Sequence, residues 1–103
     1  MTETHIKQQI RDYLKIQGFF TFPIVQGLGA AKGIPDRMAF KNDRALLIEV
    51  KTFKGKLSPE QAEFKKSIEM ESGKHIRYIL ARSLEDVMQV VMDMGLESHK
   101  ILF

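Results

Sequence analysis

The sequence predicts a small α/β domain with a mixed β-sheet, and three observations carry this prediction. The chain has 103 residues, which suffices for one compact domain and is too short for two. Segments with helical spacing of apolar residues alternate with short β-branched and aromatic segments. A strand, a helix and a second strand follow one another between residues 44 and 81, and such a crossover is expected to be right-handed and parallel. The predicted order of elements is α-β-β-β-α-β-α, with helices flanking the sheet. They form a single domain over residues 1–103.

The first helix is predicted over residues 3–17, because its apolar side chains recur at helical spacing and Gly18 is a natural stop. The segment FFTFPIV, residues 19–25, is aromatic and β-branched and predicts a strand, in which Pro23 favours an edge position or an early end. Residues 26–35 hold three glycines and a proline, so we expect a loop there.

A β-hairpin is expected next, with strands over residues 36–41 and 44–51. Asn42 and Asp43 between them suit a two-residue turn. A turn of that length sets the register of the two strands, and a three-residue turn would change which residues face each other.

The second helix is predicted to begin at Ser58, a good N-cap that is followed by proline at the first helical position. Gln61 stands at the capping-box position of this helix. A strand over residues 76–81 and a helix that opens near Ser83 complete the order.

The composition narrows the class of protein. The absence of cysteine excludes disulfides and thiolate metal sites and fits a reducing compartment. No apolar run approaches about 20 residues, and the polar start lacks a signal peptide, so we expect a cytoplasmic protein without a membrane segment. The 16 Lys and Arg against 13 Asp and Glu give a net charge of +3, which permits a nucleic-acid partner without requiring one.

The stretch IEVK places Glu49 and Lys51 in an otherwise apolar strand. Side chains alternate along a strand, so these two point to one face and their neighbours Ile48 and Val50 to the other. With a two-residue turn, Asp36 faces Glu49, and their Cβ atoms are expected roughly 5 Å apart. Two like charges that face each other directly destabilise a sheet. A divalent cation bound between them would make their arrangement favourable.

This grouping suits phosphodiester hydrolysis, which needs a nucleophilic water, a cation on the phosphate and positive charge near the developing oxyanion. Asp36 and Glu49 are candidate ligands of Mg²⁺ or Mn²⁺, and Lys51 is a candidate to orient or deprotonate the water. The alternative is that the Glu-x-Lys motif is a surface ion pair, which would contribute little to stability.

Three motifs in order resemble a known family: GIPD at 33–36, IEVK at 48–51 and LSPEQ at 57–61. They resemble the PD-(D/E)xK nuclease superfamily, and more closely its VRR-NUC domain, the virus-type replication-repair nuclease. The similarity extends from TETHIKQQI near the start to ARSLEDV near the end. It implies a restriction-endonuclease-like fold and Mg²⁺- or Mn²⁺-dependent cleavage of DNA, often branched or flapped. Single-domain members of viral or phage origin look like homodimers, so the resemblance implies a homodimer, in the bacterial host cytoplasm if the chain is phage-encoded. A replication or helicase partner is compatible with it.

The resemblance also implies roles for individual residues. Asp36 and Glu49 match the metal-binding acids, and the main-chain carbonyl of Val50 matches a further metal ligand. Lys51 matches the catalytic lysine.

Two further matches have a second interpretation. Gln61 matches a glutamine of the catalytic site, and it is equally suited to cap its own helix. Glu3 matches an acid that the first helix brings to the metal, and acids are favoured in any first turn by the helix dipole.

Four basic residues flank the predicted site and are candidate DNA contacts, with plain solvation as the alternative. They are Lys32, Arg37, Lys54 and Lys56. The competing function is a module that binds branched DNA with little or no catalysis. Such a module would keep the basic surface but would not need Asp36, Glu49 and Lys51 together.

Overall fold

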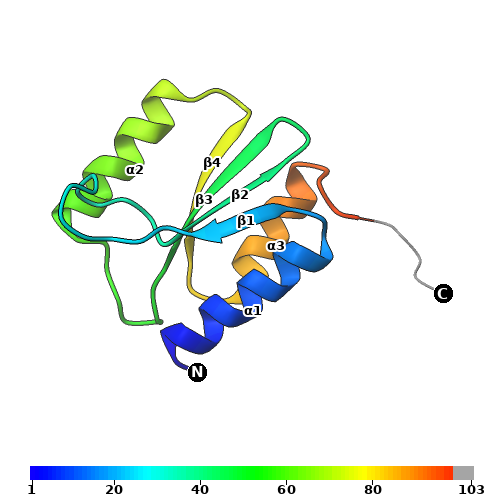
Figure 1. Cartoon of the computed structure of the whole chain (residues 1–103), viewed down its shortest axis with the longest axis horizontal. Helices are drawn as coiled ribbons and strands as arrows, with labels where there is room; N and C mark the ends of the chain where they lie inside the picture. The colour runs from blue at the N-terminus through cyan, green and yellow to red at the C-terminus, as the bar shows by residue number, and fades with distance from the viewer. Residues whose placement is uncertain (99–103) are drawn as a thin grey trace.

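The computed structural model describes residues 1–98, and the seven elements follow in the predicted order (Figure 1). They are α1 (Glu3–Ile16), β1 (Phe20–Pro23), β2 (Arg37–Lys41), β3 (Arg44–Val50), α2 (Pro59–Glu71), β4 (Ile76–Ala81) and α3 (Leu84–Asp93). The prediction of an α/β domain with a small mixed sheet is thus confirmed. Within the described residues, no helix has the length and apolar character needed to cross a bilayer.

The four strands form one sheet in the order β1-β2-β3-β4. The first three strands are antiparallel to their neighbours, whereas β3 and β4 run parallel, as the intervening α2 crossover requires. Asn42 and Asp43 both have positive φ, of 49° and 66°, the conformation of a two-residue type I′ hairpin turn. Lys41 pairs with Arg44, so the register is the predicted one.

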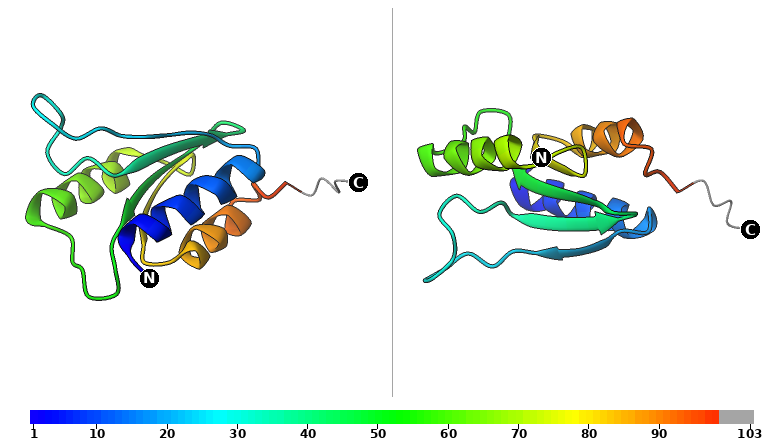
Figure 2. Two further views of the ribbon diagram at one scale, coloured as in Figure 1. Left: turned by 60° about the horizontal axis from the view of Figure 1, so that its bottom comes forward. Right: turned by 90° about the horizontal axis from the view of Figure 1, so that it is seen from above.

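The sheet separates two layers of helices, with α1 and α3 on one face and α2 on the other (Figure 2). The core lies between the sheet and the α1–α3 layer, where inward side chains of the helices meet alternate residues of the strands. The largest fully buried side chains of this core are Ile10, Leu14, Leu46, Ile48, Val50, Val87 and Val91.

The opposite face is only partly covered, because α2 has no fully buried residue. Beyond α2, the rings of Phe20, Phe22 and Phe40 shield one another on the first two strands, with centroids 5.6 to 6.4 Å apart. Glu49 of β3 points to this α2 face, between the helix and the sheet.

The strand boundaries differ from the predicted ones at the end that matters for function. β1 ends at Pro23, which has no N–H for a further ladder bond, and β2 starts at Arg37 rather than at residue 36. Asp36 departs from the regular ladder: its N–H donates to the Ile48 carbonyl at 2.9 Å, while its carboxylate accepts from the Val50 N–H at 2.8 Å. A side chain thus closes the end of this hairpin.

Candidate active site

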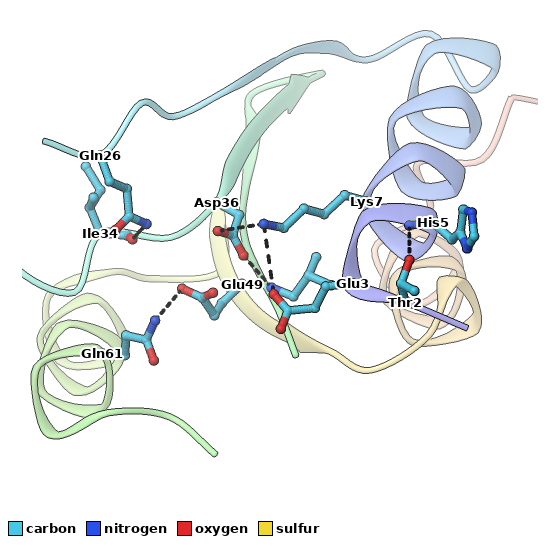
Figure 3. Close-up of polar contacts among 10 residues, drawn as sticks. Thr2, Glu3, His5, Lys7, Gln26, Ile34, Asp36, Glu49 and Gln61 are labelled. Atoms are coloured by element: carbon cyan, nitrogen blue, oxygen red, sulfur yellow. Dashed lines mark hydrogen bonds and ion pairs between the residues drawn. The ribbon is translucent and has the colours of Figure 1, made fainter. Parts of the chain in front are cut away.

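The candidate site lies where β3 ends, between the first turns of α1 and α2 (Figure 3). Figure 3 shows the Asp36 and Glu49 side chains between Gln61 of α2 on one side and Glu3 and Lys7 of α1 on the other. Residues far apart in the sequence meet here because three elements begin or end at the same edge of the sheet.

Glu49 is the one buried charged residue of the described chain, with only 2% of its surface exposed. Burial raises its pKa to about 8, helped by a hydrogen bond to the Asp36 carboxyl and by the Asp36 charge. Lys51 and Lys7 act in the opposite direction and favour the ionised form. The two carboxyl groups therefore meet as the hairpin register predicts, and Glu49 is largely protonated near neutral pH.

Asp36 is held by the end of β3. Its Oδ2 accepts the Val50 N–H, and the N–H and C=O of one residue in an extended strand point to the same side. The Val50 carbonyl is thereby directed toward the side on which Asp36 lies. The assignment of this carbonyl as a metal ligand rests on the resemblance and stays a prediction.

Lys7 takes a place that the sequence did not predict. Its Nζ lies 3.5 Å from Asp36 Oδ1 and 4.0 Å from Glu3 Oε1, so an ammonium joins the acids of two elements. Glu3 reaches the acid pair through Lys7, and no group of three His, Cys, Asp or Glu side chains within residues 1–98 is placed to hold a metal ion. The four-residue spacing of Glu3 and Lys7 was the available signal.

Gln61 combines both predicted roles. Its Nε2 donates to Glu49 Oε1 at 3.2 Å, while its Oε1 accepts the Ser58 N–H at 2.8 Å. The Ser58 hydroxyl in turn accepts the Gln61 N–H at 3.1 Å, which completes the capping box. The cap fixes the orientation of the amide, and the amide thereby fixes one oxygen of Glu49.

Gly33 allows the GIPD segment to lie directly against α2. Its φ is +77°, and an added Cβ would come within 2.2 Å of the Glu60 carbonyl oxygen and 2.8 Å of the Gln61 nitrogen. Only glycine fits this backbone conformation and this approach without displacement. The contact brings the segment that leads into Asp36 against the helix that carries Gln61.

Lys51 follows β3 directly and is half-buried. Its N–H donates to the Ala81 carbonyl at 3.0 Å, which extends the pairing with β4 by one step. Its charge lowers the pKa of Glu49, so the ammonium acts on the acid pair. The chain then folds back, and Gly55 lies so near that an added Cβ would be 3.3 Å from the Lys51 Cβ.

The four candidate DNA contacts are not equivalent. Lys32, Lys54 and Lys56 are exposed. Arg37 is half-buried, because alternation along β2 turns it to the face opposite Asp36, and its Nη1 donates to the Thr21 hydroxyl at 3.1 Å. Burial and the Arg11 charge lower the pKa of Arg37, and the side chain helps to line a cavity of about 170 Å³ beside Asp36.

Tyr78 of β4 is a second residue that sequence reasoning missed. It pairs with Leu47 in the parallel ladder, and its hydroxyl is buried without a hydrogen-bond partner among residues 1–98. Burial and the charges of Glu49 and Asp36 raise its pKa, so the phenol stays neutral beside the acid pair. An aromatic residue in a strand carries no signal in the sequence that separates this position from ordinary packing.

The donor set fits a hard divalent cation. Two carboxylates and a main-chain carbonyl are the oxygen ligands that Mg²⁺ and Mn²⁺ prefer, with water and substrate oxygens completing the shell. Burial first, and the Asp36 carboxyl second, raise the pKa of Glu49, and a bound cation would favour the ionised form of both acids.

No protein-family model matches the chain, and a search of curated proteins finds no match either. The acid pair with Lys51 is therefore the main feature of the chain that points to a function.

Proposed function

We propose that this chain is a metal-dependent DNA endonuclease with a restriction-endonuclease-like fold, of the VRR-NUC type. The observation that carries the proposal is the pair of carboxyl groups, Asp36 and buried Glu49, at the end of β3 beside Lys51. A buried acid in contact with a second, half-buried one destabilises a fold, and such perturbed groups gather at functional sites. Mg²⁺ or Mn²⁺ is the ligand class that this oxygen set favours.

The roles of the residues follow from their positions. Asp36, Glu49 and the Val50 carbonyl hold the cation, which supplies polarisation of the phosphate and activation of a water when it is bound. Gln61 holds Glu49 in place through its amide, and the capping box keeps that amide oriented.

As an ammonium, Lys51 contributes positive charge at the point where negative charge develops on the phosphate oxygens, and it donates a hydrogen bond that orients the attacking water. Only as a neutral amine can it accept the proton of that water. Glu3 belongs to a second layer, since it reaches Asp36 through Lys7. Lys7 neutralises the acid pair in the absence of a cation, and it is free to turn toward a phosphate when a cation takes that role.

The substrate class is DNA, and the resemblance favours branched forms such as four-way junctions or flaps in viral or phage replication, recombination or repair. The net charge of +3 and the exposed Lys32, Lys54 and Lys56 support a polyanionic partner. A homodimer would place two such sites on opposite strands of a branched duplex, and a helicase or other replication protein is a compatible partner.

The nuclease is tested by cleavage of end-labelled four-way junction, flap, duplex and single-stranded DNA in Mg²⁺, Mn²⁺ and EDTA. We expect metal-dependent cuts by the wild type, and a loss of at least about 100-fold in Lys51→Ala, the scale of losing one preorganised charge at a reacting oxyanion. Lys74→Ala is the matched control, because Lys74 is an exposed lysine in the turn before β4.

Two outcomes would contradict the proposal. Binding of a junction without cleavage under every metal condition would favour the DNA-binding module instead. Equal cleavage by wild type and Lys51→Ala would remove Lys51 from the mechanism.

The dimer is tested separately by light scattering at micromolar protein. We expect twice the mass of the chain for the free protein. A mass of one chain would contradict the dimer and would leave the nuclease proposal unaffected.

A further inference from the structure

Arg82, the first residue after β4, makes an unusual set of contacts. Its Nη1 donates hydrogen bonds to three main-chain carbonyls, those of Thr52, Phe53 and Gly55, at 2.7, 3.1 and 2.7 Å. A guanidinium nitrogen carries two N–H groups, so one of them is shared between two carbonyls. All three carbonyls belong to the loop that directly follows Lys51.

The main chain at Arg82, from which the guanidinium extends, is itself held in place. The Arg82 N–H donates to Asp86 Oδ2 at 2.8 Å, and the preceding carbonyl, of Ala81, accepts the Lys51 N–H at 3.0 Å. The two chain segments that leave the parallel pair β3–β4 are thus joined twice, once by the main chain and once by the guanidinium.

The loop needs such an anchor. Residues 52–55 leave the sheet and form a turn. Within this turn the Gly55 N–H donates to the Thr52 carbonyl at 3.0 Å. Main-chain carbonyls that leave a sheet must find other donors, and a permanently charged planar guanidinium can serve several at once.

The loop also bears directly on Lys51. Gly55 lies against the Lys51 side chain, since a Cβ added there would be 3.3 Å from Lys51 Cβ and 3.4 Å from Lys51 Cδ. A shift of the loop would therefore release the aliphatic stem of Lys51. The same loop carries Lys54, which is exposed and free to meet a phosphate.

We propose that Arg82 is a positioning residue of the site, which clamps loop 52–55 against Lys51 and so keeps the Lys51 ammonium beside Glu49. This role rests on the proposed nuclease function, in which Lys51 acts on the reacting phosphate. Arg82 touches neither the acid pair nor the substrate in this scheme, so it acts through the loop alone.

The test compares Arg82→Gln and Arg82→Lys with the wild type and with Arg77→Gln. Gln cannot reach three carbonyls, and the Lys ammonium lacks the planar fork. Arg77 is the matched control, an exposed arginine on the neighbouring strand β4. The readouts are amide hydrogen exchange over residues 52–56, kcat and KM for cleavage, and Mn²⁺ affinity.

We expect faster exchange at the Gly55 N–H in both Arg82 variants and a fall in kcat of about 10- to 100-fold, since small misplacements of a reacting group have effects of that size. The Mn²⁺ affinity of both Arg82 variants should stay at the wild-type value. The melting temperature of the control, Arg77→Gln, should also match that of the wild type. Arg82→Lys keeps the charge, so it supplies the answer if Arg82→Gln does not fold.

Unchanged exchange in the loop, or lowered thermal stability with wild-type kcat at low temperature, would overturn the proposal. If the wild type itself cuts no DNA, the nuclease function fails, and the exchange measurement still decides whether Arg82 holds the loop. The two failures are therefore distinct.

Discussion

Glu49 combines almost complete burial with a second carboxyl group in contact. Its pKa of about 8 means that the folded chain binds a proton there, which the unfolded chain, with the ordinary value of 4.5, releases at much lower pH. Between these two pH values the folded state holds more protons than the unfolded state, so this group makes the free energy of unfolding decrease as pH rises. The acid pair is most easily tolerated in acid and becomes a liability near pH 8 without a cation.

Replacing Glu49 with Gln removes this dependence. We expect Glu49→Gln to gain stability over the metal-free wild type as pH rises from 4.5 to 8, by up to about 1.4 kcal/mol per pH unit. Chemical denaturation in EDTA across that range measures the difference. Glu63→Gln, an exposed acid on α2, is the control. A stability difference that stays constant with pH would contradict the raised pKa of Glu49.

Gln61 permits a separation of its structural and site roles. Ser58→Ala removes the N-cap hydroxyl and should cost about 1 kcal/mol of stability. It keeps the Ser58 main-chain N–H that orients the Gln61 amide, so kcat should not change. Gln61→Glu keeps the acceptor for the Ser58 N–H but replaces the donor to Glu49 with a third carboxylate. We expect a fall in cleavage rate of about tenfold for Gln61→Glu, the scale of one hydrogen bond. Cleavage by Gln61→Glu at the wild-type rate would show that the Glu49 contact is not needed.

At the scale of elements, the hairpin β2–β3 and its two-residue turn determine which acids meet. The Asn-Asp pair indicated that turn, and side-chain alternation then placed Asp36 and Glu49 on one face, so this part of the site was predictable from the sequence. Alternation also makes Arg37 a weaker candidate for a DNA contact than the exposed lysines, since it points away from its neighbour Asp36.

Other contacts of the site depend on how the helices pack. The approach of Lys7 to Asp36 is set by where α1 crosses the sheet, and the Arg82 contacts are set by the path of a loop without regular pairing. Local sequence patterns predict neither the place where α1 crosses the sheet nor the path of this loop. The buried Tyr78 hydroxyl likewise depends on how α2 covers the sheet.

The packing of the GIPD loop on α2 can be tested through its glycine. Gly33→Ala would place a methyl group 2.2 Å from the Glu60 carbonyl oxygen at a φ of +77°. Gly29→Ala is the matched control, because it has a φ of +89° and open space around it. Backbone strain alone should cost about 1 kcal/mol at Gly29, and the clash should bring Gly33→Ala to about 3 kcal/mol or more. Equal losses in denaturant unfolding would mean that the loop does not pack on α2 as described.

At the scale of the whole molecule, an acidic centre sits in a domain of net charge +3. Exposed lysines on the loops around that centre would meet the phosphate backbone, whereas the acid pair would repel it until a cation binds. Affinity for DNA should therefore depend strongly on salt concentration.

Loss of two loop lysines should weaken this dependence in a countable way. For duplex DNA in EDTA, we expect the slope of log affinity against log salt to fall by about two in the Lys54→Gln, Lys56→Gln double variant, since each phosphate contact contributes about 0.9. The pair Lys66→Gln, Lys74→Gln, exposed elsewhere on the chain, should leave the slope unchanged. A slope equal to that of the wild type in the first variant would exclude these lysines from the DNA interface.

The most direct test of the Asp36–Glu49 pair as a metal site is a calorimetric titration of Mn²⁺ into the protein near pH 8. The titration is made with the protein alone and with uncleavable phosphorothioate DNA. We expect binding by the wild type, with protons released from Glu49, and at least about tenfold weaker binding by Glu49→Gln, while Glu63→Gln binds normally. Absence of binding at millimolar Mn²⁺ in both conditions, or equal affinity of wild type and Glu49→Gln, would show that the Asp36–Glu49 pair is not a metal site.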